Sequence, residues 1–161
     1  MSFTGELVLE RVWLRWHGPF VVSDLSEYDD PCLDNDAGVY TFLDTEELAR
    51  GWGGYALLYV GMVYGRPFRQ RISEHAVSNG DEPWRWIHRN LQDVLTVKVA
   101  TVIPEQGRNI TESLVRDIEN LLLFRLDPPG NVQGVETYTG RGLTVMNEGR
   151  FSPLTRRISV L

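Results

Sequence analysis

The chain of 161 residues has little cysteine, little lysine and no long apolar run, and the first and last of these shortages each exclude a class of protein. The single cysteine, Cys32, cannot form an internal disulfide, and no Cys/His cluster offers a structural zinc site. The longest strongly apolar stretch, residues 55–64, is too short to cross a bilayer. The N-terminus carries Glu6 and Glu10 instead of the basic residues and apolar core of a signal peptide. We therefore expect a soluble, cytoplasmic, single-domain protein that has no membrane partner.

The net charge of −6 is unevenly distributed along the chain. Residues 1–47 hold eleven acidic residues against Arg11 and Arg15, so this segment carries −9 and the other 114 residues carry +3. Fifteen of the sixteen basic residues are arginine, which binds phosphate through two parallel hydrogen bonds, although a coding bias explains the preference equally well. The charge of the whole chain thus leaves a nucleic-acid partner open.

The apolar pattern predicts a small fold of strands and helices. Runs of β-branched and aromatic residues predict strands at 38–43, 55–63 and 95–103, and the first two pair as an antiparallel hairpin. One helix begins at Pro67, and a second begins at Asn109 or Thr111. We predict an α/β (α+β) fold in which helices flank a small three-stranded, largely antiparallel sheet.

Extra segments are expected on both sides of this core. A short strand with mixed faces at 7–14 precedes His17-Gly18-Pro19, which breaks the chain, and β-like pieces follow around 143–145 and 158–160. The expected division is an acidic N-terminal extension over 1–37, a core over 38–131 and a C-terminal β-like extension over 132–161.

Several side chains have the chemistry of a phosphodiester hydrolase, which needs a metal-binding carboxylate, a cation for the phosphate and a proton acceptor. Glu119 lies about 90° from the centre of the apolar stripe of its helix, where a carboxylate can face a cleft, although most helix glutamates simply face solvent. Arg71 and His75 stand four residues apart on one helix face. Tyr40 and Tyr59 fall on the two strands of the predicted hairpin.

The tripeptides Gly38-Val39-Tyr40 and Tyr59-Val60-Gly61, followed by the run 68–75, resemble the start of the GIY-YIG nuclease superfamily. That family places the two tripeptides on a hairpin, before a helix that bears an arginine and often a histidine four residues on. A third strand, a helix with a metal-binding glutamate and a Pro-x-x-Asn-like turn then follow. The resemblance covers residues 38–131, since Glu119 and Pro128-Pro129-Gly130-Asn131 come in the same order.

The resemblance implies an endonuclease that hydrolyses phosphodiester bonds in DNA with one Mg²⁺ or Mn²⁺ ion. Glu119 would hold the ion, and Arg71 would bind the scissile phosphate. Tyr40 would accept a proton from the attacking water, and Tyr59 would orient the water or the phosphate. One histidine would assist, and the two that compete for this role are His75 and His88.

Other residues would support the site or contact nucleic acid. Gly38 and Gly61 would allow close backbone packing at the strand ends, and Asn131 would brace the turn or the metal-binding helix. The candidate nucleic-acid contacts are Arg66, Arg69, Arg85 and Arg89. The chain has no obvious zinc finger or helix-turn-helix, so a homodimer or a partner protein is expected to supply target recognition.

Two rival interpretations remain. The chain can be a catalytically inactive module of GIY-YIG fold that binds nucleic acid or protein. Alternatively, the match is accidental and the tyrosines are packing residues of an unrelated sheet. Tyr40, Tyr59, Arg71 and Glu119 would not meet in the second case.

Overall fold

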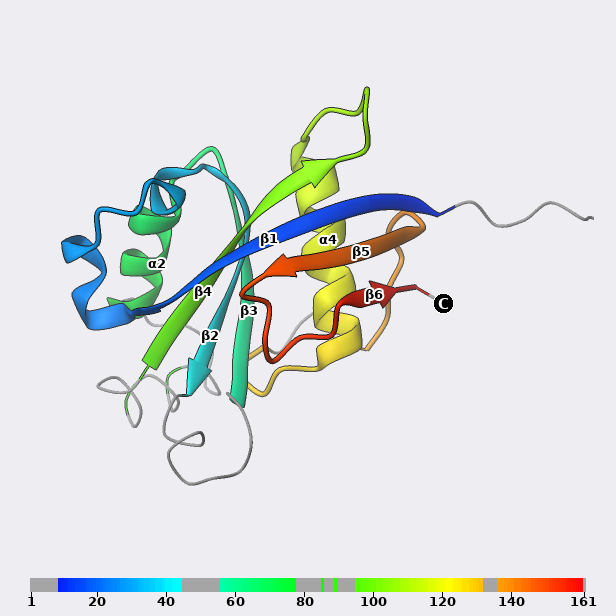
Figure 1. The fold of residues 1–161 in the computed structure, drawn as a ribbon. Coiled ribbons are helices and arrows are strands. Elements are labelled where there is room, and N and C mark those ends of the chain that lie inside the picture. Colours follow the sequence, from blue (N-terminus) through cyan, green and yellow to red (C-terminus); the bar gives the residue numbers. More distant parts are fainter. Residues whose placement is uncertain are drawn as a thin grey trace, which may run out of the picture.

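Residues 9–44, 56–77, 85, 89, 95–131 and 136–160 are described by a computed structural model of the chain. They form a six-stranded mixed sheet, curled into half a barrel, in the order β3-β2-β4-β1-β5-β6 (Figure 1). The strands are β1 (Glu10–Val21), β2 (Ala37–Asp44), β3 (Ala56–Tyr64), β4 (Leu95–Pro104), β5 (Leu143–Gly149) and β6 (Arg157–Ser159). The helical elements are η1 (Val22–Glu27) and η2 (Pro31–Asp34), both 3₁₀ helices, and α2 (Phe68–Val77) and α4 (Glu112–Leu126).

The prediction of a small three-stranded sheet flanked by helices is therefore wrong. The expected strands lie within β2, β3 and β4, which pair antiparallel, but β4 also pairs antiparallel with β1. β1 in turn pairs in parallel with β5, and β6 completes the sheet. All three added strands, β1, β5 and β6, come from the two terminal segments, so the sheet is twice as wide as the core alone would give.

β1 is longer than the short strand predicted over 7–14, and its pairing with β4 and β5 explains most of this difference. The sequence His17-Gly18-Pro19 was expected to break the chain, yet β1 passes through it with a bulge between His17 and Phe20. Gly18 has φ of +112°, and a Cβ at this position would lie 2.9 Å from the carbonyl oxygen of Val97. The residues that suggest a chain break thus make a bulge that keeps the strand paired with β4.

Each face of the sheet has its own core. Neighbouring residues of β2 belong to different cores: Val39 packs in the core around α4, and Tyr40 packs in the core around α2, η1 and η2. α4 contributes the apolar stripe expected for it. Its N-cap is Thr111, whose side chain accepts a hydrogen bond from the Leu114 N–H at 3.2 Å. No helix in the described part of the chain is long and apolar enough to cross a membrane.

Candidate active site

A contact between Tyr40 and His75 lies at the centre of the predicted site residues. Tyr40 comes from β2 and His75 from the last turns of α2, and Oη of Tyr40 lies 3.2 Å from Nδ1 of His75. Both side chains are buried. The rings of Phe42 and Phe68 meet the Tyr40 ring edge-on, with centroids 5.5 and 6.5 Å away. Aromatic rings therefore fix the phenol against the imidazole.

Tyr59 joins this pair from β3. Its ring stacks on Tyr40 with centroids 6.4 Å apart and meets the His75 ring edge-on at 4.5 Å. In the β2–β3 pairing, Tyr40 lies opposite Gly61 and Tyr59 lies opposite Phe42, so the two tyrosines are diagonal neighbours. The three rings form one aromatic cluster across the hairpin and α2.

The two motif glycines lie where a side chain would collide with its neighbours. A Cβ at Gly61 would lie 2.4 Å from Cζ of Tyr40, so the tyrosine ring passes directly over this residue. A Cβ at Gly38 would lie 2.1 Å from the carbonyl oxygen of Ala100 and 2.7 Å from the Phe68 ring. Gly61 thus admits the Tyr40 ring, and Gly38 allows β2 to pack closely against β4 and α2.

Glu119 and Arg71 reach the same region from α4 and α2. Burial raises the pKa of Glu119 to about 7, against the opposing charges of Arg116 and Arg71. Burial also raises the pKa of Tyr40 well above its usual range; Tyr59 and Glu119 raise it further, and the Arg71 charge lowers it. These mutual effects place Tyr40, Arg71 and Glu119 within electrostatic range of one another.

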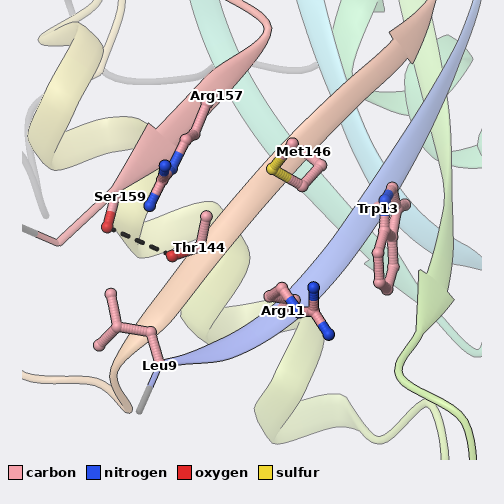
Figure 2. Close-up of a pocket in the computed structure, with 7 residues that line it drawn as sticks. All are labelled: Leu9, Arg11, Trp13, Thr144, Met146, Arg157 and Ser159. Atoms are coloured by element: carbon pink, nitrogen blue, oxygen red, sulfur yellow. Dashed lines mark hydrogen bonds between the residues drawn. The ribbon is translucent and has the colours of Figure 1, made fainter. Parts of the chain in front are cut away.

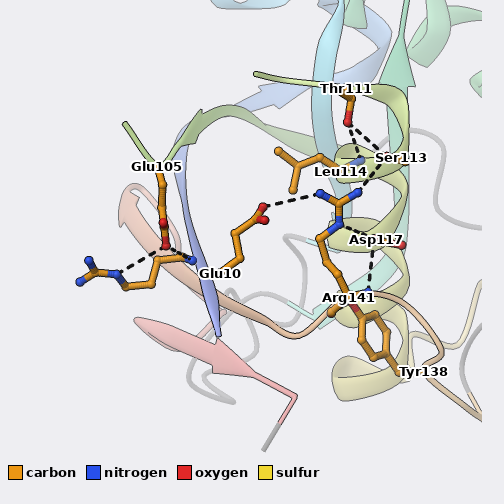
Figure 3. A network of polar contacts seen from close by, with 9 residues as sticks. Glu10, Glu105, Thr111, Ser113, Leu114, Asp117, Tyr138 and Arg141 are labelled. Atoms are coloured by element: carbon orange, nitrogen blue, oxygen red, sulfur yellow. Dashed lines mark hydrogen bonds and ion pairs between the residues drawn. The ribbon is translucent and has the colours of Figure 1, made fainter. Parts of the chain in front are cut away.

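The other acidic residues of α4 have partners among the described residues, and Glu119 has none there. Asp117 accepts a hydrogen bond from Nε of Arg141 at 2.7 Å, and the same guanidinium lies 3.6 Å from Glu10 (Figure 3). Glu112 pairs with Arg116 at 3.0 Å. Among the residues that the structure describes, none makes a hydrogen bond or ion pair with the Glu119 carboxylate. A half-buried carboxylate in this state favours a cation from solution.

The turn after α4 is fastened to β3 beside the second motif. The Asn131 side chain accepts a hydrogen bond from the Val60 N–H and donates one to the Val60 carbonyl, each at 2.9 Å. The Gly130 N–H donates to the Leu58 carbonyl at 2.7 Å. β3 is an edge strand, so its outer backbone groups are available for these bonds. They fix the C-terminal end of the helix that carries Glu119 relative to Tyr59 and Gly61.

Two of the four arginines predicted to bind nucleic acid, Arg66 and Arg69, form contacts within the protein. Arg69 donates to the Asp34 carboxylate at 3.1 Å and to the Leu25 carbonyl at 2.7 Å, so it holds η1 and η2 against α2. Arg66 pairs with Glu74 at 2.8 Å.

Arg85 and Arg89 are exposed. His88, the rival of His75, lies outside the described residues. A role of the four arginines in nucleic-acid binding stays a prediction.

Arg116 lies close to Glu119 and was not among the site residues predicted from the sequence. Arg116 precedes it by three positions on α4, and its charge lowers the pKa of the Glu119 carboxyl. The spacing i, i+3 on one helix would have indicated this neighbour. Arg71 and Arg116 together bring positive charge to the carboxylate from two helices.

A hard divalent cation fits this donor set. Mg²⁺ prefers oxygen ligands and commonly uses one or two protein carboxylates while it keeps several waters. Glu119 supplies one such carboxylate, and its raised pKa reflects burial that a bound cation would offset.

A hollow elsewhere on the molecule lies on the outer face of β1, β5 and β6 (Figure 2). It is lined by Leu9, Arg11, Trp13, Thr144, Met146, Arg157 and Ser159, and Arg11 lies over the Trp13 ring at 5.8 Å. Thr144 and Ser159 meet across its floor at 3.4 Å. None of these described lining residues is a carboxylate, so the hollow provides no site for a hard metal, and Glu119 remains the candidate ligand.

Comparison of the chain with protein-family models, with curated proteins and with solved structures finds no match in any of the three. The function is therefore inferred from the residues and their geometry.

Proposed function

We propose that the chain is a divalent-metal-dependent endonuclease that hydrolyses phosphodiester bonds in DNA at a single-metal site of GIY-YIG type. The observation that carries the proposal is that four elements bring five side chains to one region, among them a carboxylate with no hydrogen bond or ion pair to the described part of the chain. These are Tyr40 on β2, Tyr59 on β3, Arg71 and His75 on α2, and Glu119 on α4. Metal ligand, phosphate cation and proton acceptor are the three parts that such a hydrolysis needs.

Glu119 and Arg71 would act on the scissile phosphate, Glu119 through the metal ion and Arg71 directly. Mg²⁺ or Mn²⁺, when held by Glu119, supplies positive charge to the scissile phosphate and to the leaving oxygen. The Arg71 guanidinium makes no hydrogen bond or ion pair with the rest of the described chain, so its donors are available to phosphate oxygens. The metal ion at Glu119 and the Arg71 guanidinium would both act on one phosphate. The bound phosphate would therefore link Arg71 with the Glu119 carboxylate, two groups that do not pair in the described part of the free protein.

Tyr40 and His75 would move the proton. Tyr40 is protonated at neutral pH because burial raises its pKa, so the phenol can donate to Nδ1 of a neutral His75. Its oxygen then presents lone pairs to the attacking water. As the water attacks the phosphorus, its proton passes to Tyr40 while the phenol proton passes to His75. Tyr59, in contact with both rings, would hold the water in line.

Nicking of supercoiled plasmid tests the proposal. We expect cleavage in Mg²⁺ or Mn²⁺ that EDTA abolishes and that Glu119→Gln reduces by roughly 100-fold or more. Glu112→Gln is the matched control, since Glu112 is an exposed glutamate on the same helix, and it should cleave like the wild type. Binding of DNA without cleavage, indifferent to metal and to Glu119, would favour the inactive binding module instead.

Recognition of the target stays a separate prediction. The proposed site contacts phosphate and water, which every sequence offers, so specificity must come from other surfaces. A homodimer or a partner protein is the expected source.

A further inference from the structure

His17, Asp30 and Cys32 form a second cluster of metal-ligating side chains, which shares no residue with the candidate active site. One ligand atom from each residue lies within 4.8 Å of the other two. Within the described ranges these three are the group of His, Cys and acidic residues that could hold an ion. Cys32 is buried, and His17 and Asp30 are half-buried.

The fold brings the three ligands together from β1 and from η2 with its N-cap, which η1 separates along the chain. His17 is the last residue of β1 that pairs with β4 before the bulge at Gly18-Pro19. Asp30 is the N-cap of η2, and its Oδ1 accepts a hydrogen bond from the Cys32 N–H at 3.0 Å. This bond fixes the Asp30 carboxylate beside the thiol and leaves its second oxygen uncommitted to the cap.

We propose that His17, Asp30 and Cys32 bind one Zn²⁺ ion, which fastens η2 to the bulged end of β1. A thiolate, an imidazole and a carboxylate form a borderline-soft donor set that suits Zn²⁺ and not Mg²⁺. The two anionic ligands balance the charge of the ion. His17 and Asp30 also line an open groove, so a water can reach the fourth tetrahedral position.

The charges around the cluster are compatible with a cation. Arg69 lies close enough to act on both Asp30 and Cys32, but it pairs with Asp34 at 3.1 Å, which offsets its charge. Burial, with Asp30 beside it, raises the pKa of the Cys32 thiol to about 12, so the metal-free thiol is protonated. A bound ion would take the place of that proton on the sulfur.

This site would be independent of the one at Glu119. The Glu119 site offers a hard oxygen ligand, whereas the second site offers sulfur and nitrogen. This cluster could not be predicted from the sequence, because His17 is 13 residues from Asp30 and no local Cys/His spacing links them. The fold, in which η2 packs beside the end of β1, brings these residues together, and no local sequence motif does so.

Titration of the full chain with Co²⁺, followed by absorption, tests the proposal. Co²⁺ replaces Zn²⁺ at such sites, and a thiolate ligand gives an intense charge-transfer band in the near ultraviolet. We expect this band to saturate at one equivalent and to be reversed by Zn²⁺ but not by excess Mg²⁺. Glu119→Gln, which leaves the cluster intact, should give the same titration as the wild type.

Two variants identify the ligands. Cys32→Ser should abolish the band, and His17→Ala should weaken Co²⁺ binding at least about tenfold. His17 is half-buried, so its variant keeps the test valid if Cys32→Ser fails to fold. Zn²⁺ should also raise the melting temperature of the wild type and not that of His17→Ala. Absence of a thiolate band in the folded wild type, or a titration unchanged by His17→Ala, would overturn the proposal.

Discussion

Substitution of Gly61 by alanine tests the link between the second motif and the candidate catalytic pair. The new methyl group would lie 2.4, 2.5 and 2.9 Å from Cζ, Oη and Cε1 of Tyr40. An ordinary contact begins near 3.4 Å, so the ring or β3 must move by about 1 Å. Phe42 and Phe68 pack against the ring, and it is only 1% exposed, so it has no free space to enter.

This geometry predicts that Gly61→Ala lowers both the stability of the protein and its rate of cleavage. Overpacking of a well-packed core destabilises a protein by about 1–3 kcal/mol. The same shift moves Oη of Tyr40 away from His75, and a misplacement of this size can reduce a rate roughly 100-fold. We expect Gly61→Ala to show both effects, the first in urea denaturation and the second in plasmid nicking at a temperature where the variant is folded.

A double-mutant cycle separates this clash from a general effect of alanine in β3. In a Tyr40→Val background the ring is absent, so Gly61→Ala should cost at least about 1 kcal/mol less than in the wild type. An equal cost in both backgrounds would refute the reasoning, as would a folded Gly61→Ala protein that nicks at the wild-type rate.

The remaining predictions concern the titration of Glu119, the hydrogen bonds of Asn131 and the ion pairs of Arg141. Because burial raises the pKa of Glu119 to about 7, its ionisation opposes folding, and stability in EDTA should fall between about pH 4.5 and 7. At pH 8 in EDTA, Glu119→Gln should therefore be about 1–3 kcal/mol more stable than the wild type by urea denaturation, and an equal or lower stability would contradict this. Asn131→Ala removes two hydrogen bonds to Val60 and should cost about 1–3 kcal/mol; an unchanged midpoint would show that these bonds contribute nothing. Arg141→Gln loses the 2.7 Å contact with Asp117 and should cost about 1 kcal/mol while the folded protein nicks at the normal rate, whereas a catalytic defect would place this network in the site.

Parts of the site could be anticipated from the sequence because the relevant signals are local. A run of β-branched and aromatic residues, four-residue spacing on a helix and an apolar stripe with a carboxylate at its rim each constrain one element. These signals placed Tyr40, Arg71 and Glu119 on β2, α2 and α4. The contact of Tyr40 with His75 depends on how α2 packs on the sheet, which no local pattern specifies.

The width of the sheet could not be anticipated, for a physical reason. β1 pairs in parallel with β5, so Glu10 meets Leu143 and Trp16 meets Gly149 across more than a hundred residues of chain. Such a pairing is stabilised by packing on α4 and not by any property of either segment alone. Gly18-Pro19 added to the error because a bulge and a chain break use the same residue types.

The central claim is that Glu119 holds the ion used in cleavage, and the Mn²⁺ dependence of plasmid nicking tests it most directly. Glu119→Asp keeps the carboxylate but withdraws it by one methylene, so this variant should still cleave yet need at least about tenfold more Mn²⁺ for half-maximal rate. Glu119→Gln should cleave at least about 100-fold more slowly than the wild type at every Mn²⁺ concentration, and Glu112→Gln should follow the wild-type curve. Identical Mn²⁺ curves for the wild type, Glu119→Asp and Glu119→Gln would contradict the account.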